Sequence, residues 1–445
     1  MRHIDITSIP LGEKYRDKQR MLRSLAQDLT EEDIRARIPE RLDHAIPGFS
    51  LGELDTEVKS GRDVSLERTF AGMLHVVAAT NNLVRKVLFP DMAFAEAVAK
   101  GSYFLTLMAA KEALVGLGPE EIAGMVAAGF VDVVYFPNLI KCGETAGMGG
   151  DKGWDRNKRI KTINASTLTA LVMASMGHTT MKHGSYGNTT RVGSTDVPEQ
   201  FGANLYQETP EDIELLIKRT GFWFSDTHAV KTLHYLSHLL MVETVNHIVG
   251  PMTPPIGPNT VLYKMMGVNH NVHPATIARA YTILHELGVV NLGGVIVLSG
   301  VDKVPNRKTI NSLKWFRRHA YLDEISQIAT IVSVATGNDF IGTEVLVGGA
   351  PFGVLLSSEH IKVPNTIPDL MRANEAALTG GKLAEYLACN VSLAMAAAEL
   401  DRNGFSKKWL KDHFLTAMHA IESGRAMERL DNYITATGGK RISWS

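Results

Sequence analysis

Apolar residues recur three and four positions apart over residues 50–128, and this spacing predicts a run of amphipathic helices. Stretches such as LERTFAGMLHVVAAT carry the period clearly, and Pro119 suits the first turn of a helix. Residues 1–45 are charged and place their apolar positions at helical spacing. We predict a helical arm over 1–45 and a small helical domain over 46–128, joined by about 200–250.

The hydrophobic period changes after the last of these helices. Apolar runs of four to eight residues then alternate with helical patterns, and this alternation is typical of an α/β domain with a mainly parallel sheet. We place this larger domain at 129–199 and 251–445. Strands are predicted at 131–136, 261–268, 295–299, 329–334 and 344–347, with helices at about 166–176, 273–287 and through 370–433.

Composition narrows the classes of protein to be considered. The 445 residues are 45% hydrophobic with a formal net charge of −1, so no global field attracts nucleic acid or an anionic membrane. The two cysteines form no CxxC motif, which favours a reducing, cytoplasmic setting over a disulfide framework. No apolar leader and no apolar run long enough for a membrane span is present, so we expect no membrane association.

Three polar clusters follow the first predicted strand. The first is GMGGD at 147–151, the second is NAST at 164–167, and the third is KHGSYGNTTRVGSTD at 182–196. Small residues let backbone amides approach an anion closely, and hydroxyl, lysine and arginine side chains add hydrogen-bond donors. A helix start such as 164–167 also favours negative charge. These clusters predict a site for a phosphorylated ligand.

The order and spacing of these clusters resemble the anthranilate phosphoribosyltransferases, which belong to glycosyltransferase family 3 and share the nucleoside phosphorylase-type fold. In that family a GTGGD loop, an N-x-S-T helix start and a KHG…GSxD segment hold phosphoribosyl pyrophosphate. The likeness extends to PEEIAG at 119–124, GPMTPP at 250–255 and SGRAMERL at 423–430. It covers most of 50–435, and we interpret the chain as a divergent member.

The resemblance implies a small helical domain packed on a larger α/β domain, with the active site in the cleft between them. It implies transfer of phosphoribose from phosphoribosyl pyrophosphate to an amine or ring nitrogen, with magnesium, in a homodimer. The catalytic candidates are Lys182, His183 and Arg191. The substrate-binding candidates are Gly147, Gly149, Gly150, Asp151, Asn164, Ser166, Thr167, Gly184, Tyr186, Thr190, Gly193, Ser194, His234 and His238.

The chain departs from the family where the acceptor would bind. Tyr186 stands in a turn where the family has arginine, and it either stacks on a ligand ring or packs in the core. The helix at 234–241 lacks the family's arginine, so a carboxylate acceptor loses its guanidinium partner. We therefore expect an aromatic or heterocyclic acceptor other than anthranilate, contacted by His234 or His238 unless these are core histidines.

The family's magnesium-binding GLDE motif is matched here to Gly300-Val301-Asp302-Lys303. One carboxylate is kept and a lysine replaces the other, whereas a hard cation prefers oxygen ligands. We expect one magnesium ion, held by Ser166, Asp302 and the substrate, rather than two ions.

Lys152–Lys161 is a basic loop that carries five basic residues and one tryptophan beside the first cluster. It is either a lid over pyrophosphate, a contact for a larger phosphorylated ligand, or a solvated surface loop. Two other functions stay open. A nucleoside phosphorylase would bind phosphate and tolerate the lost metal carboxylate. A non-catalytic paralogue would bind nucleic acid through the loop, although the neutral net charge makes nucleic acid a poor partner.

Overall fold

The computed structural model describes residues 28–135, 139–148, 160–186, 192–205, 209–240, 242, 244–364 and 366–444. Backbone contacts divide the chain into two compact units. The helical unit takes its residues from 1–136, 227–258 and 283–290, and the sheet unit from 137–226, 259–282 and 291–445.

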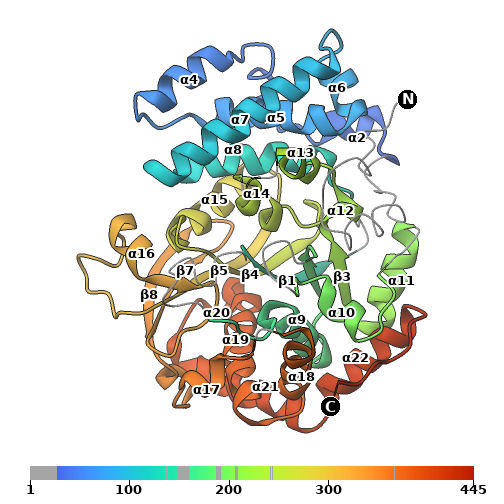
Figure 1. The fold of residues 1–445 in the computed structure, drawn as a ribbon, viewed down its shortest axis with the longest axis vertical. Coiled ribbons are helices and arrows are strands. Elements are labelled where there is room, and N and C mark those ends of the chain that lie inside the picture. Colours follow the sequence, from blue (N-terminus) through green and yellow to red (C-terminus); the bar gives the residue numbers. More distant parts are fainter. Residues whose placement is uncertain are drawn as a thin grey trace. The chain divides into compact units, whose positions relative to one another are not determined.

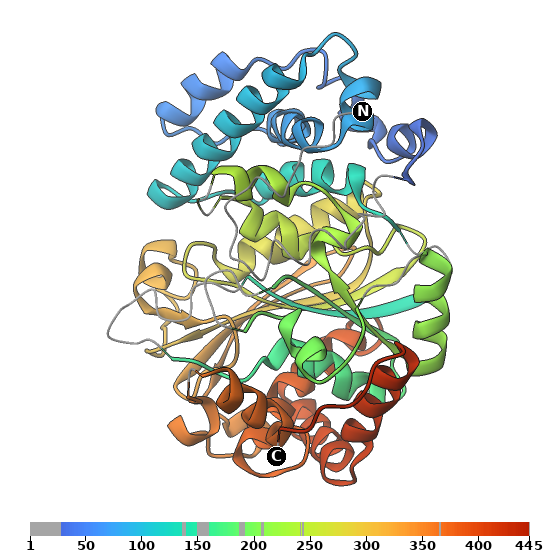
Figure 2. The same cartoon turned by 45° about the vertical axis from the view of Figure 1, so that its right-hand side comes forward.

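The helical unit is built around α5, which packs against α7 and α8 (Figure 2). Later segments of the chain join the same unit, because α13 contacts α5 and α7, and α14 packs on α8. Its elements are α2 (Glu31–Ala36), α3 (Glu40–Asp43), α4 (Leu51–Lys59), α5 (Leu66–Thr80), α6 (Asn82–Leu88), α7 (Phe94–Leu114), α8 (Pro119–Gly129), η3 (Phe130–Asp132), α12 (Thr227–Val230), α13 (His234–Leu240) and α14 (Asn246–Met252).

A buried ion pair fixes the start of α8. Pro119 opens the helix, as its fixed φ angle favours. Lys111 Nζ lies 2.9 Å from Glu121 Oε1, and the Glu121 carboxylate accepts the backbone N–H groups of Gly118 and Val64. The carboxylate thus satisfies two backbone amides and one ammonium group, which explains why a charged residue is buried at this position.

The sheet unit holds a mixed sheet in the order β3-β2-β1-β4-β5-β7-β8, with β6 paired to β5 (Figure 1). The first five strands of this order run parallel, whereas β6, β7 and β8 add antiparallel pairs. The strands are β1 (Lys141–Gly147), β2 (Thr180–Gly184), β3 (Phe222–Asp226), β4 (Val261–Gly267), β5 (Asn291–Val301), β6 (Ala320–Leu322), β7 (Ala329–Ala335) and β8 (Phe340–Val347).

Helices α9 and α19 pack together on one face of this sheet (Figures 1 and 2). Every residue of α9 except Ser166 is buried, because the helix lies between the sheet and further helices. The elements that complete the unit are α9 (Ala165–Ser175), α10 (Asp196–Gln200), α11 (Pro210–Thr220), α15 (Pro274–Glu286, whose last turn belongs to the helical unit), α16 (Leu313–His319), η4 (Ala350–Phe352), α17 (Ser358–Ile361), α18 (Ile367–Ala377), α19 (Gly381–Ala398), α20 (Leu400–Asn403), α21 (Lys407–Glu422) and α22 (Arg425–Ala436).

The predicted α/β class is confirmed, and so are the strands near 261, 295, 329 and 344, but the predicted strand at 131–136 is wrong. Residues 130–132 form a 3-10 turn, and the strand that leads into the glycine cluster is β1 at Lys141–Gly147. The sequence analysis also missed β2, which carries Lys182 and His183. Both strands are short and polar, and pairing inside a parallel sheet overrides their weak intrinsic preference.

Within the described part of the chain, no helix has the length and apolar character that a membrane crossing requires.

Candidate active site

Three strands of the parallel sheet end in glycine at the same edge. β1 ends at Gly147, β4 at its register partner Gly267, and β2 at Gly184. A Cβ atom on Gly147 would lie 2.6 Å from Asp323 Oδ2, and one on Gly267 would lie 1.7 Å from the Asp323 carbonyl oxygen. Side chains at these positions would therefore displace the segment after β6. Ligands of open α/β sheets bind at this carboxyl edge.

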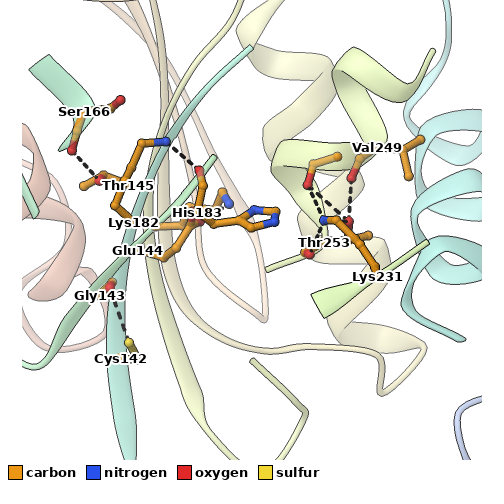
Figure 3. Close-up of polar contacts among 12 residues, drawn as sticks. Cys142, Gly143, Glu144, Thr145, Ser166, Lys182, His183, Lys231, Val249 and Thr253 are labelled. Carbon is orange, nitrogen blue, oxygen red and sulfur yellow. Dashed lines mark hydrogen bonds and ion pairs between the residues drawn. The ribbon is translucent and has the colours of Figure 1, made fainter. Parts of the chain in front are cut away.

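Lys182 is a buried cation at this edge. Its side chain is 2% exposed, and its Nζ donates a hydrogen bond to the His183 carbonyl oxygen at 2.6 Å (Figure 3). Burial lowers the pKa of Lys182 to about 8, while the carboxylates of Glu144 and Asp323 act in the opposite direction. Glu144 in turn forms an ion pair with Lys264 of β4. Lys182 is thus held among fixed charges at the strand end.

The last residues of the third cluster, 193–196, fold back onto the end of β2. A Cβ atom on Gly184 would lie 2.6 Å from Ser194 Cβ and 3.5 Å from Lys182 Nζ. Thr195 N donates to the Ser185 carbonyl oxygen at 3.1 Å, and Gly193 N donates to Asp196 Oδ2 at 2.8 Å. The structure therefore brings Gly184, Ser194 and Lys182 together, as the sequence pattern predicted.

The start of α9 belongs to the same edge. Thr145 of β1 donates to the Ser166 carbonyl oxygen at 2.6 Å (Figure 3), and Asn164 Nδ2 donates to the Gly193 carbonyl oxygen at 3.5 Å. Among the described residues the buried Thr167 Oγ1 has no hydrogen-bond partner. The first turn of a helix offers amides and a positive dipole end, so this position suits an anion.

The surroundings of Tyr186 favour packing in the core over stacking on a ligand ring. Its side chain is buried, and its hydroxyl donates to Glu199 Oε1 of α10 at 3.2 Å. The ring is therefore packed inside the protein, and its hydroxyl is satisfied by Glu199.

His234 and His238 lie on α13 of the helical unit. His234 is half-buried, and a Cβ atom on Gly250 would lie 2.5 Å from its Cε1 atom. The His228 ring lies 5.7 Å from the His234 ring. His234 thus belongs to a packed cluster of aromatic rings inside its own unit.

Several predicted residues lie outside the described part of the chain. They are Gly149, Gly150, Asp151, Thr190 and Arg191, together with residues 152–159 of the basic loop.

Asp302, the predicted metal ligand, contacts a histidine and lies beyond the carboxyl edge of the sheet. Asp302 Oδ1 lies 2.7 Å from His319 Nδ1. Leu298 of β5 is level with Gly267 at the carboxyl edge, so Asp302 lies four residues, or about 13 Å of strand, beyond that level. The chain then returns through α16 and β6.

A second match to the family's GLDE motif lies at the end of β6 and directly after it. Leu322-Asp323-Glu324 contains both carboxylates of an LDE sequence, and Asp323 is the residue that lies against Gly147 and Gly267. Glu324 Oε2 accepts a hydrogen bond from the Tyr386 hydroxyl at 2.9 Å. The LDE motif is visible in the sequence. Residues 303–319 separate it from β5, so the motif was matched to Asp302, which directly follows β5. Across the described ranges, no group of three or more His, Cys, Asp or Glu residues is arranged to hold a metal without further ligands.

Comparisons with known proteins agree with this architecture. The family described as "Glycosyl transferase family, a/b domain" matches residues 144–308. The anthranilate phosphoribosyltransferase of Ignicoccus hospitalis is 28% identical over 348 residues, covering 77% of this chain and 88% of that protein. The enzyme of that name from Neisseria meningitidis is 29% identical over 321 residues, covering 70% and 79%.

Solved structures show the same fold at low sequence identity. The anthranilate phosphoribosyltransferase of Thermus thermophilus superposes with a TM-score of 0.63 at 21% identity, covering 86% of this chain and 99% of that one. The Saccharomyces cerevisiae enzyme, solved in complex with PRPP and Mg, gives 0.61 at 19% identity, covering 87% and 99%. These comparisons support the resemblance of this divergent chain to the anthranilate phosphoribosyltransferase-like family of glycosyl transferases.

Proposed function

We propose that this chain is a phosphoribosyltransferase that moves phosphoribose from phosphoribosyl pyrophosphate to an aromatic or heterocyclic nitrogen. The observation that carries the proposal is the convergence of Lys182, Ser194 and the start of α9 on the carboxyl edge of the sheet. In the reaction the bond between ribose C1 and the pyrophosphate oxygen breaks. A bond from C1 to the acceptor nitrogen forms, and that nitrogen loses its proton.

The site's main task is to stabilise charge on the departing pyrophosphate. The Lys182 ammonium group and the amides at the start of α9 are fixed before the substrate arrives, so little reorganisation is required in the transition state. The protein holds Lys182 partly dehydrated, which strengthens its attraction to a phosphate oxygen. Arg191 and His183 remain proposed partners in this task.

The residues at this edge fit a magnesium ion. Asp323, Glu324 and Ser166 offer hard oxygen donors, and the absence of a side chain at Gly147 leaves room beside Asp323 Oδ2. Magnesium usually binds proteins through one or two carboxylates and completes its shell with water and substrate phosphates. A bound ion would neutralise pyrophosphate charge. We therefore propose Asp323 and Glu324, with Ser166, as the metal ligands in place of Asp302.

The identity of the acceptor rests on α13. This helix contains histidines but no arginine, so we propose an acceptor other than anthranilate. The relatives named above are anthranilate phosphoribosyltransferases, so anthranilate must be the reference compound in any acceptor screen. A homodimer is also proposed, and light scattering of the purified protein would test it.

Calorimetric titration with phosphoribosyl pyrophosphate, with and without magnesium, tests the function and the metal site together. We expect magnesium-dependent binding by the wild type and its loss in Lys182→Ala. The matched pair Asp323→Asn and Asp302→Asn separates the two metal assignments. The first should weaken magnesium-dependent binding by at least about tenfold, whereas the second should change it by no more than about twofold.

Two outcomes would overturn these assignments. Binding of inorganic phosphate or a nucleoside in place of phosphoribosyl pyrophosphate would replace the transferase with a nucleoside phosphorylase. A loss of magnesium dependence in Asp302→Asn alone would return the metal site to Asp302.

A further inference from the structure

The segment Lys440–Trp444, which we call the strap, runs across the end of α10. Lys440 N donates to the Gly202 carbonyl oxygen at 3.1 Å and Ile442 N to that of Phe201 at 2.9 Å. Trp444 Nε1 donates to the Gln200 carbonyl oxygen at 2.9 Å. Gly202 has a φ of +100°, and a Cβ atom there would lie 1.8 Å from the Lys440 carbonyl oxygen, so the close approach requires glycine.

The other side of the strap is anchored on one buried carboxylate. Glu375 of α18 is 6% exposed and accepts from the Arg441 guanidinium, from the Ser443 hydroxyl at 3.3 Å and from Trp444 N at 2.7 Å. Arg441 also pairs with Asp431 of α22 at 2.9 Å. Because three donors come from a single short segment, Glu375 has few other ways to be satisfied.

The residue next to Glu375 reaches the candidate active site. Asn374 is fully buried, and its Oδ1 accepts from Asn164 N at 2.8 Å while its Nδ2 donates to Asn164 Oδ1 at 3.1 Å. Asn164 precedes the first turn of α9. These two bonds, from the Asn374 side chain to the backbone and the side chain of Asn164, fix the direction in which α9 begins.

The other end of the strap connects to the same site through α10. The contacts at Gln200, Phe201 and Gly202 hold the end of α10, and the start of α10 carries Asp196, which binds Gly193 N. Asn164 Nδ2 donates to the Gly193 carbonyl oxygen. The contacts thus form a closed ring that runs from α9 through α18, the strap and α10 back to α9.

We propose that the strap, together with Glu375 and Asn374, positions the two phosphate-binding segments of the active site relative to each other. The inference rests on the proposed function. The strap itself is largely exposed, with Ile442 48% exposed, so it contributes little apolar burial to the core. Its contacts instead end on residues that neighbour the site. These residues are positioning residues, and they touch neither the substrate nor the reacting atoms.

The test compares the double variant Arg441→Ala/Trp444→Ala and the single variant Glu375→Gln with wild type. The control is Arg372→Ala, which breaks an exposed ion pair with Asp369 on the same helix. Calorimetry should show phosphoribosyl pyrophosphate binding weakened by about tenfold in both strap variants, because small misplacements of binding groups are costly. The melting temperature should fall by no more than about 4 °C. The control should match wild type.

Hydrogen exchange of the ligand-free proteins gives a second readout that does not depend on the function. Amides in 160–170 and 192–205 should exchange faster in the strap variants, while those of β4 and β5 should be unchanged. Wild-type binding together with unaltered affinity and exchange in the variants would overturn the strap proposal. Absence of wild-type binding would overturn the proposed function, and the exchange comparison would still decide whether the strap orders these segments.

Discussion

Lys182 in the sheet unit and Lys231 in the helical unit are both buried lysines, but their surroundings differ (Figure 3). Lys231 Nζ donates to the carbonyl oxygens of Gly250 and Thr253 and to Thr253 Oγ1, at 2.8, 2.7 and 2.6 Å. Lys182 Nζ has a single hydrogen-bond acceptor, the His183 carbonyl oxygen, among the described residues. One ammonium group is saturated by its own unit and the other is not.

This difference supports a structural role for Lys231 and the proposed ligand-binding role for Lys182. Burying a charge costs free energy, and hydrogen bonds recover that cost only when the group is satisfied. Lys231 satisfies carbonyls at the end of α14 and so stabilises that helix. Within the described part of the chain, Lys182 Nζ makes one hydrogen bond, so its other N–H groups are available to a ligand oxygen at the carboxyl edge of the sheet.

The largest expected effect is on the stability of the helical unit. Lys231→Met keeps the volume but leaves buried carbonyls without their donor, so the free energy of unfolding should fall by about 3–5 kcal/mol. Urea unfolding measures this change. Lys100→Met, which breaks an exposed pair with Glu96 in the same unit, is the control and should cost less than about 1 kcal/mol. Equal losses of stability in Lys231→Met and Lys100→Met would show that the buried Lys231 ammonium group stabilises the unit no more than an exposed lysine does.

Lys182→Met should lower the rate of the reaction without lowering the stability of the protein. Removing a buried charge with few partners should leave the free energy of unfolding unchanged or raise it. The rate of phosphoribosyl transfer should fall by about 10²–10³-fold, as for the loss of one preorganised donor. Steady-state kinetics and urea unfolding on the same preparation provide the comparison. A destabilised Lys182→Met with intact activity would show that Lys182 is structural like Lys231.

The pH dependence of ligand affinity tests whether the charged form of Lys182 binds the ligand. The pKa of Lys182 is lowered to about 8 by burial, so the ligand-free protein loses this charge as the pH rises through about 8. Affinity for phosphoribosyl pyrophosphate should then fall by up to about tenfold per pH unit. Lys182→Met should lack this alkaline loss, and an unchanged pH profile in that variant would contradict the assignment.

The same shift predicts a change in stability with pH. Between pH 8 and the ordinary lysine pKa of 10.5, the unfolded chain binds the proton that folded Lys182 has released. The free energy of unfolding of the wild type should therefore rise with pH across this window relative to Lys182→Met.

The smallest expected effect tests how fully Lys231 is saturated. Thr253→Val removes one acceptor of the Lys231 ammonium group and leaves both carbonyls in place. The free energy of unfolding should fall by about 1 kcal/mol, the usual net value of one hydrogen bond. Urea unfolding can resolve this loss. A decrease as large as that of Lys231→Met would show that the hydroxyl, rather than the carbonyls, satisfies the ammonium group.

Many of the candidate site residues could be chosen from local sequence patterns. The third cluster gave Lys182, Gly184 and Ser194 as candidate site residues, and in the structure these three are neighbours. The position of the metal-binding motif was harder to predict, because an insertion lies between the strand and the motif. Residues 303–319 separate β5 from the LDE motif, so the motif match fell on Asp302 although Asp323 lies at the carboxyl edge. A return of the chain through α16 and β6 leaves no local signal.

The α/β class, the helical character of residues 50–128 and the glycine- and hydroxyl-rich character of the three clusters follow from the sequence alone. These properties depend on hydrophobic period and residue type, which are local. Three other features became visible in the folded chain: β2 is a strand, Asp323 faces Gly147, and Lys440–Trp444 reaches Glu375. Each of these depends on segments far apart in the chain, whose contacts are set by packing rather than by local preference.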